Sequence, residues 1–149
     1  MLRAVLRHLF LLAALPALVL AYGSAAQNAL AQNATPANRV VMQVSDGDPA
    51  KWNLALNNAH NLQSDLGARN VAIEIVAYGP GIEMLKADSL VGNRIGEALS
   101  AGVKVVACEN TMRAQKLTKP DMLDGIAYVS AGVTEIMQRQ QQGWAYLRP

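Results

Sequence analysis

The feature that most constrains the fold of this chain is the alternation of short apolar runs with longer segments of helical periodicity. The apolar runs are rich in β-branched residues and predict strands at residues 39–45, 70–78, 103–108 and 126–130. Parallel neighbours need a connection of a dozen or more residues, usually a helix, and the segments between these runs are long enough. The alternation therefore predicts an α/β fold: a three-layer α/β/α sandwich around a mainly parallel sheet of four or five strands.

Helices are predicted in the connections, at residues 49–66, about 89–101, about 111–117 and 133–142, with a shorter helical turn at 82–86. The Gly79-Pro80-Gly81 turn is expected to break regular structure. In the last helix Val133, Ile136 and Met137 have the spacing of a face directed at the core. Residues 144–149 are expected to form a short extended tail.

The first 31 residues have the organisation of an export signal. Two arginines without an acidic partner come first, an apolar run follows at residues 9–22, and small residues come after it. The apolar run has about fourteen residues, whereas a membrane-spanning helix takes roughly 20. We therefore predict a signal peptide at residues 1–31, cleaved after Ala26 or Ala31, and a periplasmic mature protein. The alternative is an uncleaved signal that anchors the chain in the membrane.

Residues 32–38 are polar and contain a proline, so we expect a disordered leader before a single domain at residues 39–149. Without the signal peptide the chain has 118 residues, with 11 basic and 11 acidic side chains. A neutral chain of this kind lacks the basic surface that nucleic acids and anionic membranes attract. We expect no nucleic-acid partner, and no membrane association once the signal is removed.

Ligands of open parallel sheets bind beyond the carboxyl ends of the strands. The loops predicted at that edge contain Asp46-Gly47-Asp48, Gly79-Pro80-Gly81, Cys108-Glu109-Asn110-Thr111 and Ser130-Ala131-Gly132. The first loop is acidic and the chain has no dinucleotide-binding or P-loop motif, which argues against a phosphate site. A phosphoacceptor receiver domain would end its third strand in aspartate, not cysteine. Ligands at zinc spacing are also lacking, so we expect no metal and no cofactor.

Cys108 is the only cysteine, so the chain cannot form an internal disulfide. It ends a predicted strand and precedes a predicted helix, whose free N–H groups favour a thiolate and lower the thiol pKa. Glu109 acts in the opposite direction by like-charge repulsion. Two interpretations stay open: Cys108 is a reactive thiol, or it is a small buried hydrophobic residue.

Four segments in one order resemble the DsrE/DsrF-like family, in its small single-domain branch with export signals. They are VVMQVSDGDPAKWNLALNNAHNL, IEIVAYGPGIEML, VVACENTMRAQKL and VSAGVTEIMQRQQQGWAYLRP, and the resemblance covers nearly all of residues 39–149. It implies a sandwich fold that assembles into homo-oligomers, typically trimers or hexamers, with sites near subunit boundaries. It also implies that Cys108 stands where sulfur-relay members carry the cysteine that receives and passes on a persulfide.

The residues and the resemblance together predict an exported sulfur-handling or thiol-redox protein with Cys108 as the nucleophile. The residues expected to support it are Asn110, Thr111, Asp46, Gly79 and Gly81. The first two would donate hydrogen bonds to the sulfur, and the others would shape the approach to it, although Asp46 and Asp48 also suit a plain turn and helix cap. A protein that donates or accepts sulfur is the expected partner. The alternative is a non-catalytic homo-oligomeric module that binds a ligand or a partner protein, with Cys108 buried and inert.

Overall fold

The computed structural model describes residues 36–149. The predicted signal peptide and most of the predicted leader lie outside the described residues. The first strand begins at Asn38, so this residue belongs to the sheet and not to the leader. Within residues 36–149, no helix combines the length and the apolar character needed to cross a membrane.

The centre of the fold is a five-stranded sheet, and all its neighbouring strands run parallel. The strands are β1 (Asn38–Val44), β2 (Val71–Ala77), β3 (Lys104–Cys108), β4 (Ala127–Val129) and β5 (Ala145–Leu147), in the spatial order β4-β3-β2-β1-β5. The predicted α/β fold is confirmed. The tail that we expected to be merely extended contributes β5, in which Tyr146 lies opposite Val41 of β1.

The helical elements are α3 (Pro49–Leu66), η1 (Gly79–Leu85), α4 (Gly92–Ser100), α5 (Glu109–Ala114), η2 (Lys119–Asp121) and α6 (Gly132–Gln141). Helix α3 starts as the sequence predicts, because Asp48 accepts a hydrogen bond of 2.8 Å from the Ala50 N–H. Helix α4 starts a few residues later than predicted, because turns occupy the preceding residues and its N-cap, Val91, supplies no side-chain cap.

The expectation that Gly79-Pro80-Gly81 breaks regular structure is wrong, because these residues form the first turn of the 3-10 helix η1. Proline is compatible with a first helical turn, where its missing N–H would have no partner. Gly81 is fully buried against β1, and a Cβ atom at this position would overlap the Val44 carbonyl oxygen. The glycine therefore lets η1 approach the sheet closely.

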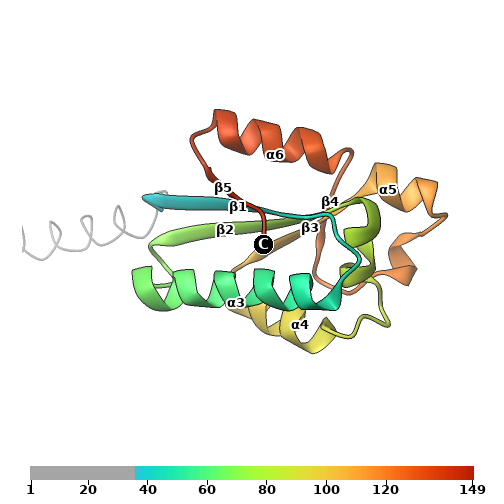
Figure 1. The fold of residues 1–149 in the computed structure, drawn as a ribbon, viewed down its shortest axis with the longest axis horizontal. Helices are drawn as coiled ribbons and strands as arrows, with labels where there is room; N and C mark the ends of the chain where they lie inside the picture. The colour runs from blue at the N-terminus through green and yellow to red at the C-terminus, as the bar shows by residue number, and fades with distance from the viewer. Residues whose placement is uncertain (1–35) are drawn as a thin grey trace, which may run out of the picture. The chain divides into compact units, whose positions relative to one another are not determined.

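Helices cover both faces of the sheet, with α3 and α4 on one side and α6 on the other (Figure 1). From β1 to β4 the chain adds strands in one direction, and it then returns past all of them to place β5 beside β1. Crossovers between parallel strands are almost always right-handed. A return in the opposite direction therefore puts its helix, α6, on the opposite face.

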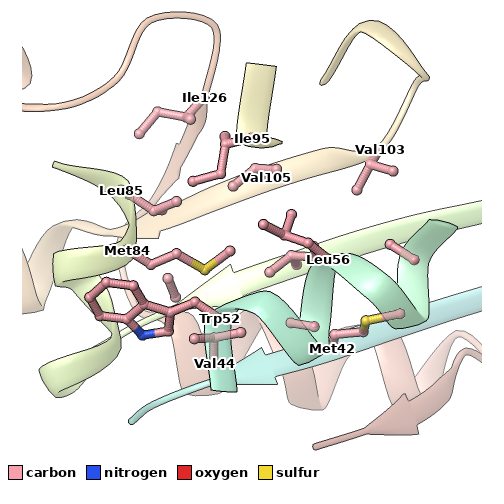
Figure 2. Close-up of a cluster of buried hydrophobic side chains, with 14 of the residues drawn as sticks. Met42, Val44, Trp52, Leu56, Met84, Leu85, Ile95, Val103, Val105 and Ile126 are labelled. Carbon is pink, nitrogen blue, oxygen red and sulfur yellow. The ribbon is translucent and has the colours of Figure 1, made fainter. Parts of the chain in front are cut away.

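Most of the core lies between the sheet and the layer formed by α3, η1 and α4. Figure 2 shows part of it, with Trp52 and Leu56 of α3 packed near Met84 and Leu85 of η1 and residues of the strands. The indole nitrogen of Trp52 donates a hydrogen bond of 2.7 Å to the carbonyl oxygen of Asp46. This bond ties α3 to the loop that follows β1.

The apolar cluster beneath α6 is much smaller. Its buried members are Val41, Val76, Val106 and Ile136. Our prediction that Val133 and Met137 face the core is wrong, because they are 64% and 49% exposed. The inward stripe of α6 instead includes the polar side chains of Arg139, which pairs with Glu74 of β2, and Glu135, which pairs with Lys104 of β3. Apolar spacing alone could not reveal that this helix packs partly through charged groups.

Candidate functional site

Cys108 is the last residue of β3 and the N-cap residue of α5. Side chains alternate along a strand, and Val106 belongs to the cluster beneath α6, so the Cys108 side chain lies on the same face. The residue is buried, with 5% of its surface exposed. The thiol therefore sits at the carboxyl edge of the sheet, between the starts of α5 and α6.

Hydrogen-bond donors at the starts of α5 and α6 act on the pKa of the Cys108 thiol. Burial raises the pKa of the Cys108 thiol, but the Thr111 hydroxyl and the backbone N–H groups of Gly132, Thr111 and Asn110 act in the opposite direction. The net result is a pKa below the usual value of a cysteine. Because a thiolate is the nucleophilic form of cysteine, this arrangement favours reactivity.

The side chain of Thr111 connects the thiol to the loop after β2. Its hydroxyl oxygen accepts a hydrogen bond of 2.9 Å from the Gly79 N–H, which leaves the hydroxyl proton free to be donated to the sulfur. Gly79 has a φ of 53°, a conformation that glycine adopts without strain. Two of the residues expected to support Cys108 therefore act together: Thr111 interacts with the thiol, and Gly79 holds Thr111.

Gly132, the first residue of α6, lies against Cys108 and Tyr78. A Cβ atom added to Gly132 would be 3.3 Å from the Cys108 Cβ atom and 3.2 Å from the Tyr78 Cβ atom. Such distances are tighter than side-chain contacts normally allow. The absent side chain therefore allows the start of α6 to approach the sulfur closely.

The other expected support residues have less direct roles. The Asn110 side chain is bound by Arg113, and its backbone N–H also donates to the Ser130 carbonyl oxygen at 3.1 Å. Asn110 therefore reaches the thiol through its backbone and not through its amide. Gly81 allows η1 to pack on β1, as described above. Asp46 lies 3.5 Å from the Arg148 guanidinium, in an exposed ion pair.

Tyr78 lies beside Gly132 and was not predicted as a site residue, and neither were Tyr146 and Arg148, whose charges act on Tyr78. Burial raises the pKa of Tyr78, and the charges of Tyr146, Asp46 and Cys108 raise it further, whereas Arg148 opposes them. Tyr146 donates a hydrogen bond of 2.6 Å to the Gln43 side chain. Tyr146 and Arg148 lie beside β1 and its following loop because β5 pairs with β1 in parallel. A strand of only three residues hardly indicates this pairing in the sequence.

A shallow groove of about 460 Å³ lies beside the site, between the edge strand β4 and α6. Residues that flank Cys108 and Gly132 in the sequence line part of it, namely Glu109, Ser130 and Ala131. Cys108 itself is not among the lining residues. Residues 36–149 hold no group of three histidine, cysteine or acidic side chains placed to bind a metal ion.

Comparisons with known proteins agree with this architecture. The model of the DsrE/DsrF-like family matches residues 38–149. A solved structure of a protein of unknown function from Methanobacterium thermoautotrophicum is 40% identical, with a TM-score of 0.72, over 75% of this chain and 99% of that one. A second, from Bacteroides thetaiotaomicron, is also of unknown function and shares the fold at 18% identity, with a TM-score of 0.59, over 78% of this chain and 100% of that one. No match was found among the curated proteins.

The family match spans the whole sheet, the helices on both faces and the loop that carries Cys108. At the level of the family it implies a role related to sulfur relay. The family model confirms the predicted resemblance over residues 38–149, and the chain belongs to the DsrE/DsrF-like family.

Proposed function

We propose that this chain is a sulfur-handling or thiol-redox protein in which Cys108 is the nucleophile. One observation carries the proposal: the sole cysteine lies against the starts of two helices, as the N-cap residue of α5 and in contact with Gly132 of α6. The Thr111 hydroxyl and the backbone N–H groups at these helix starts lower its pKa. Charge-assisted hydrogen bonds of this kind stabilise a thiolate at a lower pH than in a free cysteine. The family's relation to sulfur relay gives this thiolate a natural substrate class, the sulfane sulfur of a persulfide or polysulfide.

The proposed step is a transfer of one sulfur atom. The Cys108 thiolate attacks the outer sulfur of a donor persulfide, R–S–SH, so that a new S–S bond forms and the old one breaks. The products are the Cys108 persulfide and the donor thiolate, R–S⁻, and the proton stays on the transferred sulfur. An acceptor thiolate then takes the outer sulfur in the same way, which restores the Cys108 thiolate.

Intact mass spectrometry of the purified protein tests this proposal. After incubation with inorganic polysulfide, wild-type protein should gain the mass of one sulfur atom, and dithiothreitol should remove it. The Cys108→Ser variant should gain nothing. Full sulfur acceptance by this variant would end the proposal, since no other cysteine exists to carry the atom.

The burial of Cys108 favours a second candidate function, a non-catalytic homo-oligomeric module that binds a ligand or a partner protein. In that case the thiol is inert packing at the sheet edge, and the neighbouring groove receives the ligand. Alkylation by iodoacetamide at neutral pH separates the two functions. A thiolate with a lowered pKa should react faster than a free model thiol, whereas an inert thiol should react more slowly.

Location and assembly belong to the same proposal. We expect export to the periplasm after cleavage of residues 1–31, with anchoring by an uncleaved signal as the alternative, and the mass of the mature protein distinguishes them. We also expect a homo-oligomer, a trimer or hexamer, together with a sulfur-donor or sulfur-acceptor protein as partner. Exposed apolar side chains on α6 and β5, such as Val133, Met137 and Leu147, suit a subunit contact. Light scattering of the mature protein measures the subunit number.

A further inference from the structure

Glu74 is a charged residue in the middle of the central strand β2, and none of its surface is exposed. Its Oε2 atom lies 2.8 Å from the Arg139 guanidinium of α6 and 3.1 Å from the Lys104 ammonium of β3. Arg139 also contacts Glu135 at 2.9 Å, one turn earlier on α6. A buried carboxylate is unfavourable unless it is paired, so a movement of Arg139 away from Glu74 would be costly.

The other attachments of α6 to the sheet are few. Ile136 is its only buried large apolar side chain within the described structure, and the apolar cluster beneath it is small. The guanidinium of Arg139 is further fixed by the Trp144 ring, at 4.8 Å from the ring centroid. The ion pair between Glu74 and Arg139 is therefore a main link between the sheet and this helix.

One end of the same helix reaches the thiol. Gly132 starts α6 in contact with Cys108, and Arg139 follows two turns later, so a rigid helix connects the buried ion pair to the residue whose N–H group lowers the thiol pKa. A hydrogen bond to a thiolate depends strongly on distance and angle. A small displacement of α6 would weaken the bond from Gly132 without unfolding the sheet.

We infer that Glu74 is a positioning residue for Cys108: by holding Arg139, it fixes α6 so that the Gly132 N–H is directed at the sulfur. This inference rests on the proposed function, in which the Cys108 thiolate is the reacting group. It adds a residue that touches neither the thiol nor any substrate. Burial raises the pKa of Glu74 and the neighbouring Glu135 carboxyl raises it further, whereas Lys104 and Arg139 oppose this shift by favouring the charged carboxylate.

The test compares pH profiles of Cys108 alkylation by iodoacetamide in the wild type and in Glu74→Gln, which keeps the shape of the side chain and removes its charge. At neutral pH the variant should react about threefold to tenfold more slowly, the effect of raising the thiol pKa by about 0.5 to 1 unit. At a pH above both thiol pKa values the two rates should converge. The titratable groups Tyr78, which acts on Cys108 through its charge, and Glu109, the next residue in the chain, are the same in both proteins, so the difference reports on α6.

Glu83→Gln is the matched control, because it removes the ion pair of 3.0 Å between Glu83 and Lys86 in η1 and leaves α6 untouched. Its profile should coincide with that of the wild type. If Glu74→Gln does not fold, as judged by circular dichroism, Arg139→Gln removes the same link from the helix side while Lys104 still neutralises Glu74. It should show the same slower reaction.

Gly132→Ala gives an independent check, since its methyl group would push the start of α6 away from the thiol. Combined with Glu74→Gln, it should slow the reaction by less than the product of the two single effects, because both changes act through the position of one helix. Profiles of Glu74→Gln or Arg139→Gln that superimpose on the wild type would overturn the inference. A wild type that reacts with iodoacetamide but accepts no sulfur would instead overturn the proposed function alone.

Discussion

The Thr111 hydroxyl makes the largest favourable contribution to the Cys108 thiolate, so its removal gives the sharpest prediction. Thr111→Val keeps the shape of the side chain but deletes the hydroxyl. A hydrogen bond to a charged group contributes about 1.5–3 kcal/mol, and 1.36 kcal/mol corresponds to one pKa unit. Thr111 is only half-buried, and solvent weakens its bond, so the lower end of this range applies. We expect the pKa of Cys108 to rise by about one unit and the alkylation rate at neutral pH to fall about tenfold.

The assay is the rate of iodoacetamide alkylation as a function of pH, followed by intact mass, and the single cysteine makes each rate unambiguous. Thr111→Ser retains a hydroxyl and should keep the wild-type midpoint. Thr118→Val removes a hydroxyl that donates to Asp121 at 2.6 Å in η2, and it should change stability without moving the midpoint. An unchanged midpoint in Thr111→Val would refute the reasoning, because it would mean that the hydroxyl does not stabilise the thiolate.

Three further predictions concern stability. Gly81→Ala should lower the free energy of unfolding, measured in urea, by about 1–3 kcal/mol, because its methyl group would overlap the Val44 carbonyl oxygen. A urea midpoint equal to that of the wild type would contradict this. Asp48→Ala should cost about 1 kcal/mol in the same assay through loss of the α3 cap, whereas Asp48→Asn should cost little. The folded-state pKa of Cys108 is lowered, so the wild type should gain stability relative to Cys108→Ala as the pH rises from that pKa to about 9. A difference in free energy of unfolding that stays flat or falls over this range would contradict the lowered pKa.

The sheet and its main helices could be predicted because apolar runs and helical spacing are local signals. The first crossover is an example: Asp48 and Pro49 mark the start of α3, and the strands on either side were predicted to within one residue. The same locality explains the misassigned turn at residues 79–81. Glycine and proline usually interrupt regular structure, but here the close packing of Gly81 on β1, which depends on tertiary contacts, favours a 3-10 helix.

The candidate site could be predicted only in part, because it is assembled from distant segments. The position of Cys108 between a strand and a helix was evident, and so was the presence of Thr111 in the next turn. The sequence does not indicate that Gly132, 24 residues after the cysteine, supplies a donor to the same sulfur. The role of Glu74 is equally hidden, since one acidic residue within an apolar strand carries no sign of which helix will pair with it.

The strand order explains why two helix starts meet at one thiol. After β4 the chain must return across β3, β2 and β1 to reach the position of β5, so α6 begins near the carboxyl ends of β3 and β4. Helix α5 begins at the same edge, because it directly follows Cys108, the last residue of β3. In this topology a residue at the end of β3, such as Cys108, lies next to the starts of both α5 and α6. The double variant Ser45→Cys, Cys108→Ser moves the thiol to the end of β1. Its cysteine should have a higher thiol pKa than Cys108 of the wild type. If the cysteine at position 45 reacted as fast as Cys108, the helix starts would not set the reactivity.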